Sequence, residues 1–246
     1  MNTLLPQAKN PLSRNLPSIL ILSSNNERAS WLTNQLQGVG GKFDVRQKPV
    51  AGTATQFCNH WRLVIVDANG PTDEGLCVCQ TLRHQLPTTP ILFLARSTDT
   101  DEGLRGLEQG ADDYICHPVN PVELVARTRA LLRRHGTLDT PTVETWSVIR
   151  HKNFSLDKDS RELIINNETI PLTNREFELI WFLANHPNKV FSRSELLDKV
   201  WGYNHNGYEH TVNSHINRLR KKLNAATAKP KFLETVWGIG YRFRAA

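Results

Sequence analysis

Short apolar runs alternate with segments of helical periodicity through the first half of the chain. Within one such segment, Leu76, Cys79, Leu82 and Leu86 are spaced three or four residues apart, as on one face of a helix. Strands that alternate with helices predict a parallel sheet covered on both faces, so residues 17–135 are expected to form a doubly wound α/β domain. The runs that predict its five strands lie at residues 19–22, 43–46, 63–66, 91–94 and 114–116.

The second half has a different pattern, with short strands at both of its ends. Apolar segments around residues 154–156, 163–165 and 169–172 predict strands, and the Asn166-Asn167 pair is typical of a hairpin turn. The last segment, KFLETVWGIGYRF, predicts another hairpin that turns at residues 237–240. An α+β domain is therefore expected over residues 150–246. The aperiodic residues 136–149, which contain Gly, Pro and several Thr, are expected to be a linker.

Three helices are predicted between these hairpins. Thr173 with Glu176, and Ser192 with Glu195, have the spacing of capping boxes, in which the paired side chains satisfy amide donors at a helix start. A third helix over about residues 211–223 has one apolar face, formed by Val212, Ile216, Leu219 and Leu223. Its other face carries Asn213, Ser214, Asn217, Arg218 and Lys221.

Composition limits the class of protein. The 246 residues suit two domains with ordinary cores, because 39% are hydrophobic and 22% are charged. The apolar runs are far shorter than the roughly 20 residues of a membrane span. The polar residues 1–16 predict a flexible tail and not a signal peptide, so we expect a cytoplasmic protein without membrane contact. The four cysteines Cys58, Cys77, Cys79 and Cys116 have no C-x-x-C spacing and are expected to be buried apolar residues, with a redox role for Cys116 left open.

Positive charge is concentrated near the third predicted helix of the second domain. The chain carries a formal net charge of +6. The segment from His210 to Lys231 contains basic residues and no acidic one: Arg218, Arg220, Lys221, Lys222, Lys229 and Lys231. Such a surface suits a polyanion, although a solvated charged face is the commoner explanation of a single basic helix.

The second half resembles the winged helix-turn-helix domain of the OmpR/PhoB family. The similarity is carried by LTNREFELIWFLANHPNKVFSRSELLDKVWG, HTVNSHINRLRKKL and TVWGIGYRF. It implies that helix 211–223 enters the major groove of promoter DNA, that the terminal hairpin is a wing in the minor groove, and that RNA polymerase is a partner. The residues that the resemblance places at DNA are His210, Thr211, Asn213, Ser214, His215, Asn217, Arg218, Arg220, Lys221, Lys222, Trp201, Trp237, Gly238, Tyr241 and Arg242.

Two positions depart from the pattern of that family, which usually has Arg where this chain has His210 and Trp237. Histidine is mostly neutral at pH 7, so the first change removes a permanent phosphate contact. The second removes a cation from a groove that attracts cations. We therefore expect DNA binding with an affinity or site preference that differs from the family norm.

The first half resembles the CheY-like (βα)5 receiver domain of two-component response regulators. LVIVDANGPTDEGLCVC, PILFLARS and GLEQGADDYICHPVNPVELVARTRALLRR carry the similarity. It implies that Asp67, at the end of the third strand, stands at the position that accepts a phosphoryl group from a histidine kinase. Tyr114 matches the family's switch residue. A narrower resemblance, to the NblR type of cyanobacterial regulators, is fixed by no residue of the chain.

The other residues of the receiver pocket have changed. Ser23 and Ser24 replace the acidic pair that helps to hold Mg²⁺, Ala95 replaces Thr or Ser, and His117 replaces Lys. Neutral hydroxyls recruit Mg²⁺ poorly, so we expect weak or no metal binding, no other cofactor, and signal input without aspartyl phosphorylation. Asp67 is then a vestigial carboxylate, paired with Arg96 or His117, or a binding residue for another signal. An ordinary phosphoacceptor remains the alternative.

Charged residues flank the last strand of this domain. In the family the corresponding face forms a symmetric dimer through ion pairs between subunits, and plain solvated charge is the alternative. The residues concerned are Glu108, Asp112, Asp113, Glu123, Arg127 and Arg134. The sequence thus predicts a dimeric transcription regulator that is not an enzyme, because P-loop, H-E-x-x-H and G-x-S-x-G motifs are absent. A protein-interaction adaptor whose basic helix binds an acidic partner is the alternative of another class.

Overall fold

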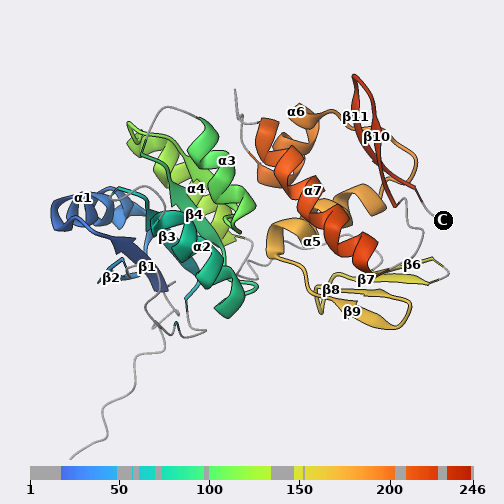
Figure 1. Ribbon diagram of the computed structural model, residues 1–246, viewed down its shortest axis with the longest axis horizontal. Coiled ribbons are helices and arrows are strands. Elements are labelled where there is room, and N and C mark those ends of the chain that lie inside the picture. Colours follow the sequence, from blue (N-terminus) through green and yellow to red (C-terminus); the bar gives the residue numbers. More distant parts are fainter. Residues whose placement is uncertain are drawn as a thin grey trace, which may run out of the picture.

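The computed structural model describes residues 18–48, 57, 61–69, 74–96, 100–133, 147–151, 153–202, 209–226 and 232–244. The predicted tail (1–16) and nearly all of the predicted linker (136–149) lie outside these residues. We refer to residues 18–133 as the N-terminal domain and to residues 147–244 as the C-terminal domain (Figure 1).

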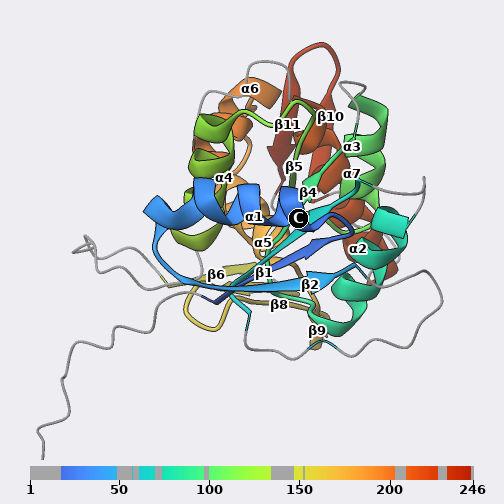
Figure 2. The same cartoon turned by 90° about the vertical axis from the view of Figure 1, so that its left-hand side faces the viewer.

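The N-terminal domain is a five-stranded parallel sheet in the order β2-β1-β3-β4-β5, as the alternating pattern predicts. Its strands are β1 (Ser18–Ser23), β2 (Lys42–Gln47), β3 (Leu63–Asp67), β4 (Ile91–Leu94) and β5 (Asp113–Ile115). Helices α1 (Asn26–Leu36) and α4 (Pro121–Arg133) cover one face, and α2 (Glu74–Gln85) and α3 (Thr100–Glu108) cover the other (Figure 2). A short 3-10 turn, η1 (Gln37–Val39), follows α1.

Both faces of this sheet are buried, which explains the continuous apolar runs. Alternate residues of one strand enter different cores: Ile65 packs on the side of α1 and α4, and its neighbours Val64 and Val66 pack on the side of α2 and α3. Glycines bring α3 close to the sheet, because a Cβ on Gly103 would lie 2.1 Å from the Tyr114 ring. A larger residue at Gly103 would therefore push α3 outward.

The C-terminal domain has an antiparallel sheet of four strands, β6 (Val148–His151), β7 (Phe154–Asp157), β8 (Glu162–Ile165) and β9 (Glu168–Ile170). Strand β6 begins inside the predicted linker, so the domain starts earlier than the sequence indicates. Helix α5 (Asn174–Ala184) follows, then α6 (Arg193–Leu196) with the π-helical turn η2 (Leu197–Trp201), and then α7 (Glu209–Ala225). The hairpin of β10 (Leu233–Val236) and β11 (Gly240–Phe243) ends the fold.

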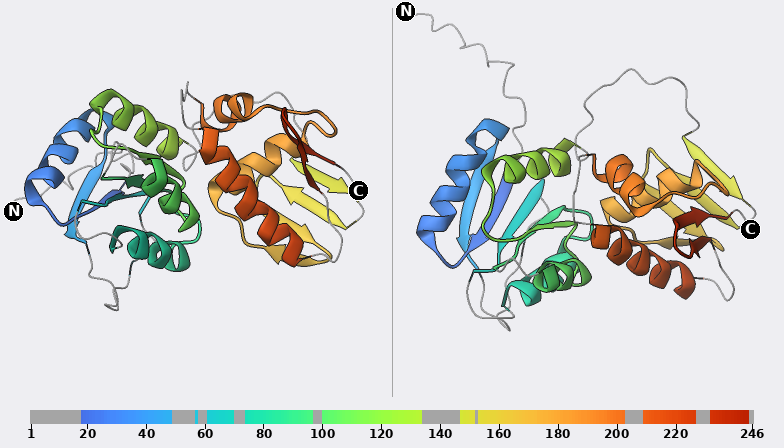
Figure 3. Two further views of the ribbon diagram at one scale, coloured as in Figure 1. Left: turned by 45° about the horizontal axis from the view of Figure 1, so that its top comes forward. Right: turned by 90° about the horizontal axis from the view of Figure 1, so that it is seen from above.

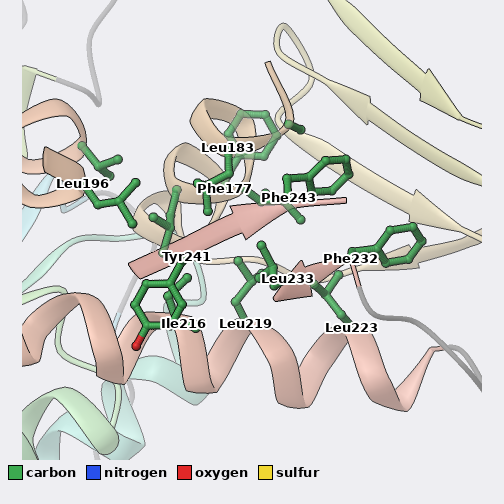
Figure 4. Packing of buried hydrophobic residues seen from close by; sticks show 14 of the residues in the cluster. Phe177, Leu183, Leu196, Ile216, Leu219, Leu223, Phe232, Leu233, Tyr241 and Phe243 are labelled. Carbon is green, nitrogen blue, oxygen red and sulfur yellow. The ribbon is translucent and has the colours of Figure 1, made fainter. Parts of the chain in front are cut away.

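The local signals of the C-terminal domain are confirmed. Asn166 and Asn167 have φ values of 52° and 67°, which is the left-handed conformation that their turn requires. Both capping boxes are present at the starts of α5 and α6. The predicted apolar face of α7 packs with the hairpin and α5. Figure 4 shows Ile216 beside Tyr241, and Leu219 and Leu223 beside Leu233 and Phe232.

The two domains are in contact through α7. Figures 1 and 3 show this helix lying between the rest of the C-terminal domain and the N-terminal domain, beside α3. The β10–β11 hairpin lies on the side of the C-terminal domain away from this contact. The polar face of α7, which the sequence assigns to DNA, thus faces protein over part of its length.

Candidate nucleic-acid interface and strand-end pocket

Arg218 and His215 of α7 bind the N-terminal domain directly. The Arg218 guanidinium donates from Nη1 to the Leu107 carbonyl at 2.8 Å and to the Ala111 carbonyl at 3.3 Å. His215 is fully buried, and its Nε2 lies 3.1 Å from the Asp112 carbonyl. Two side chains that the sequence assigns to DNA are therefore occupied at the contact between the domains.

The hydrogen bonds fix the protonation of His215. Arg218 Nη2 lies 2.7 Å from His215 Nδ1, and a guanidinium can only donate, so Nδ1 accepts. Nε2 then carries the proton and donates it to the Asp112 carbonyl. Burial, and next the charge of Arg218, hold the pKa of His215 well below its ordinary value. The contact is thus built around a neutral imidazole.

Trp201 lies at the same contact between the domains. Its side chain is fully buried, its Nε1 lies 3.5 Å from the Asp112 carbonyl, and its ring lies 5.1 Å from that of His215. The expectation that Trp201 touches DNA is therefore wrong for this arrangement, because the indole packs between the domains. Tyr203, which follows in the same segment, lies outside the described residues.

The other residues of α7 that the sequence assigns to DNA differ in how exposed they are. His210, Asn217 and Lys221 are exposed, and Ser214 is half-buried, whereas Thr211 is buried. Several others hold the fold together. Asn213 Oδ1 accepts from Arg193 and from Tyr241, Arg220 binds the Leu233 carbonyl and Thr235 of the hairpin, and Lys222 pairs with Glu176 at 2.7 Å.

A cleft of about 330 Å³ lies along the domain contact. Glu108 of α3 faces it from the N-terminal domain, and α7 contributes Arg218, Lys221 and Lys222. The contact between the domains is polar, because it is formed by the hydrogen bonds of Arg218 and His215 to backbone carbonyls. It also contains a buried polar atom, Asp112 Oδ1, that has no hydrogen-bond partner within the described part of the chain. Polar contacts between domains are typical of arrangements that open reversibly.

The terminal hairpin ends in an exposed apolar tip. Gly238 has a φ of 75°, which suits its turn, and its neighbour Trp237 is 89% exposed. At the base of the hairpin, a Cβ on Gly240 would lie 1.9 Å from the Phe191 carbonyl oxygen, so only glycine allows this approach. Tyr241 is buried there, and Arg242 pairs with Glu234 at 2.8 Å.

The strand-end pocket of the N-terminal domain surrounds Asp67, which is fully buried at the end of β3. Ser23 Oγ donates to Asp67 Oδ2 at 2.8 Å, and Arg28 Nε donates to Oδ1 at 2.8 Å. Both carboxylate oxygens are therefore bound by the protein itself. Ser24 is exposed, Ala95 is buried in the core, and Tyr114 is buried below α3.

Arg28 is a partner that the sequence pattern did not identify, because Arg96 or His117 was expected to pair with Asp67. Arg96 pairs with Glu102 at 2.8 Å. Burial and the nearby charge of Arg28 lower the pKa of His117, so this side chain is neutral and does not replace a permanent lysine charge. Lys48 was missed as well; its buried ammonium lies 3.8 Å from Glu74 and within the electrostatic reach of Asp67.

The pocket does not fit Mg²⁺ well. Octahedral magnesium sites need carboxylate oxygens, and the carboxylate of Asp67 is already neutralised by a guanidinium and bound by a hydroxyl. Ser23 and Ser24, which stand where related receivers have two acidic residues, contribute no negative charge to a metal site. A phosphoryl group approaching Asp67 would have to displace Arg28 without a metal to neutralise the two anions.

Most of the charged residues expected at a dimer interface form ion pairs within the chain, and the dimer stays a prediction. Arg127 and Asp113 are buried and pair at 2.7 Å, and Arg127 also pairs with Glu123. Asp112 is buried against Arg83 at 2.6 Å. The Asp112 carbonyl, just before β5, is bound by Trp201 and His215 of the C-terminal domain. Glu108 is exposed, and Arg134 lies outside the described residues.

The cysteines give a mixed result. Cys79 is fully buried, and burial raises the pKa of its thiol to about 12, so it is an inert core residue as expected. Cys77 is exposed, contrary to the expectation, because it falls on the outer face of α2. Cys116 is half-buried and Cys58 lies outside the described residues.

Comparison with known proteins gives consistent results for both domains. Residues 19–129 match the family model of the response regulator receiver domain, and residues 167–243 match that of the C-terminal domain of transcriptional regulatory proteins. The transcriptional regulatory protein YclJ of Bacillus subtilis, described as uncharacterized, is 42% identical over 186 residues, which cover 75% of this chain and 80% of that protein. SrrA of Staphylococcus aureus is 38% identical over 188 residues, 75% of this chain and 78% of that protein.

A similar structure covers both domains together. A mutant form of RitR superimposes with a TM-score of 0.66 at 25% identity, over 94% of this chain and all of that one. A receiver domain followed by a winged helix defines a DNA-binding transcriptional response regulator. The chain belongs to the family of transcriptional regulatory proteins that join a response regulator receiver domain to this C-terminal domain. No helix in the described part is long and apolar enough to span a bilayer.

Proposed function

We propose that this regulator exists in a closed state in which the receiver covers α7, and that it binds promoter DNA after the two domains separate. The hydrogen bonds of Arg218 and His215 to receiver carbonyls support this proposal most directly. An α-helix must enter the major groove to place side chains at base edges, and α7 cannot do so while α3 lies against it. The partners proposed are double-stranded promoter DNA, RNA polymerase and a second copy of the chain, in the cytoplasm.

We infer further that Asp67 is a structural counter-ion of Arg28 and not an efficient phosphoacceptor. Both of its oxygens are bound by protein donors, and serines stand at the two positions whose carboxylates would help to hold a metal. A histidine kinase is then one candidate source of the signal beside another regulatory protein. Without phosphorylation, regulation would act on the equilibrium between the closed and the open state of the protein. Any ligand that binds one state more tightly shifts this equilibrium toward that state.

A charge reversal on the receiver tests the closed state. Glu108→Arg is expected to raise DNA affinity up to about fivefold, because it places a cation opposite Arg218, Lys221 and Lys222 and so weakens closure by up to about 1 kcal/mol. The measurement is fluorescence anisotropy with full-length protein and duplexes that the wild type selects from a random pool.

Asp101→Arg is the matched control, because Asp101 is an exposed acid of the same helix that does not line the cleft. It adds the same charge and therefore the same general attraction to DNA. Equal affinities of the two variants would contradict the closed state. Weaker binding by Glu108→Arg alone would instead support a dimer interface at this position.

Because His215 is neutral in the closed state, we expect the DNA affinity to depend on pH. The pKa of His215 is lowered in the closed state, and we expect an ordinary value in the open state. Below about pH 6.5 the open state therefore binds a proton that the closed state does not, and the closed state loses stability as the pH falls. Above that pH His215 is neutral in both states and closure keeps its full stability. The charges of Arg218, Arg175 and Arg83 oppose protonation of the ring, and its hydrogen bond to the Asp112 carbonyl favours protonation. We expect DNA affinity to rise between about pH 7.5 and pH 5.5, by at most tenfold per pH unit.

His215→Gln provides the control, since glutamine keeps hydrogen-bonding groups but does not titrate. Binding titrations at constant ionic strength should show the steep acid response in the wild type and a flatter one in the variant. Identical pH profiles for the two proteins would remove His215 from the mechanism.

A further inference from the structure

Two large apolar side chains stand exposed at the tip of the β10–β11 wing. Trp237 is 89% exposed and Ile239 is 58% exposed, and they flank the glycine at the turn. Side chains of this size are normally buried, and adjacent exposed ones mark a surface that meets a partner. The wing lies away from the receiver in Figures 1 and 3, so closing the domains does not cover this tip.

The wing is fixed to α7. Arg220 of α7 donates to the Leu233 carbonyl at 3.2 Å and to Thr235 Oγ1 at 2.7 Å, and the Tyr241 hydroxyl lies 2.8 Å from Asn213 Oδ1. At the base of the wing, Tyr241 and Phe191 exchange two backbone hydrogen bonds of 2.9 Å. When α7 lies in a major groove, the tip is therefore held at a set place beside it, with little ordering left to occur on binding.

The chemistry of the wing is apolar and not cationic. Its charged residues are Glu234, Arg242 and Arg244, and both arginines pair with Glu234, at 2.8 Å and 3.0 Å. A minor groove attracts unpaired cations electrostatically, but this tip offers an indole and a branched aliphatic side chain. In DNA the surfaces that accept such groups are sugar rings and the faces of partly unstacked bases.

We propose that Trp237, supported by Ile239, is an apolar wedge that enters the minor groove next to the α7 site and opens a base step there. Wedges of this kind kink DNA, and pyrimidine–purine steps unstack most easily, so the wing selects a TA or CA/TG step at that place without hydrogen bonds to bases. The inference rests on the proposed docking of α7, and it assigns to the wing a part in sequence preference.

Trp237→Ala and Trp237→Arg test the wedge in the full-length protein. The DNA probes are duplexes that the wild type selects from a random pool, labelled for energy transfer between their ends or carrying 2-aminopurine at successive steps. The wild type should bend the duplex and brighten 2-aminopurine at one step. Trp237→Ala should lose both signals and bind about 5- to 100-fold more weakly, as expected for one lost stacking contact.

Trp237→Arg should recover affinity without the bend, prefer narrow A-tract grooves at that position, and make the log–log salt slope steeper by about one. Val122→Ala, which removes an exposed apolar side chain from the receiver, should bind and bend DNA like the wild type. Thermal melting confirms that each variant is folded, which is expected because Trp237 makes little contact with the core.

The outcomes separate this inference from the proposed function. If Trp237→Ala keeps the bend, the 2-aminopurine signal and the base preference, the wedge is wrong even though α7 still binds specific DNA. A loss of self-association or of polymerase recruitment with unchanged DNA signals would also overturn it and assign the tip to a protein. A failure of the wild type to select any sequence would contradict the proposed function itself.

Discussion

Replacing Arg28 by alanine is expected to lower the free energy of unfolding of the receiver by about 3–5 kcal/mol, because it leaves the Asp67 carboxylate buried and without its counter-ion. Ser23 would still donate one hydrogen bond, but a hydroxyl carries no charge. Denaturant unfolding followed by circular dichroism gives the change directly. The Arg28→Ala loss should be several times larger than that of Arg129→Ala, which removes a guanidinium bonded to the Gly38 carbonyl at the surface.

The cause of that loss is tested by a second substitution. Asp67→Asn in the Arg28→Ala background removes the unpaired charge and should recover most of the stability. If the double variant is as unstable as Arg28→Ala, the guanidinium acts through packing and not as a counter-ion. Mg²⁺ with acetyl phosphate should leave no appreciable acid-labile label on the wild type, and clear Mg²⁺-dependent labelling of Asp67 would show that Arg28 yields to a phosphoryl group.

Much of the fold could be predicted because its signals are local or are repeated along the chain. The five parallel strands are buried on both faces, so their residues form unbroken apolar runs. Each capping box joins residues three positions apart, and the Asn166-Asn167 turn depends on two adjacent residues. Strand β6 was missed because Val148–His151 alternates weakly and only pairs with β7 once the sheet has formed.

The electrostatic partner of Asp67 could not be found in this way. Arg28 and Asp67 are 39 residues apart, and nothing in the local sequence distinguishes Arg28 from other arginines near the sheet. One signal was available: Arg28 falls in the first turn of the helix after β1, and the carboxyl ends of β1 and β3 meet at the same edge of the sheet.

The contact between the domains is hidden from sequence for a different reason. Arg218 binds carbonyl groups of Leu107 and Ala111, which every residue of a chain offers. A polar helix face of Asn, Ser, His and Arg is equally suited to base edges and to backbone carbonyls. The sequence therefore identifies what α7 can bind, and only the fold shows that one set of partners lies within the same chain.

Replacing Arg218 by alanine is expected to have two opposite effects that can be measured separately. It removes the hydrogen bonds to the Leu107 and Ala111 carbonyls, so the open fraction should rise. It also removes the side chain best placed to pair with a base edge, which should weaken specific DNA binding by about 1–3 kcal/mol. We expect the second effect to be larger, because the domains stay joined by His215 and Trp201.

Small-angle scattering of the free protein reports the opening, and anisotropy with selected duplexes reports the binding. Arg220→Ala is the matched control: Arg220 bonds to the wing and not to the receiver, so its loss should weaken DNA binding without changing the scattering. Unchanged DNA affinity together with unchanged scattering in Arg218→Ala would mean that α7 does not place this residue in the groove. Unchanged scattering with weakened binding would retain the groove contact and contradict the expected rise of the open fraction, because His215 and Trp201 would then hold the domains together without Arg218.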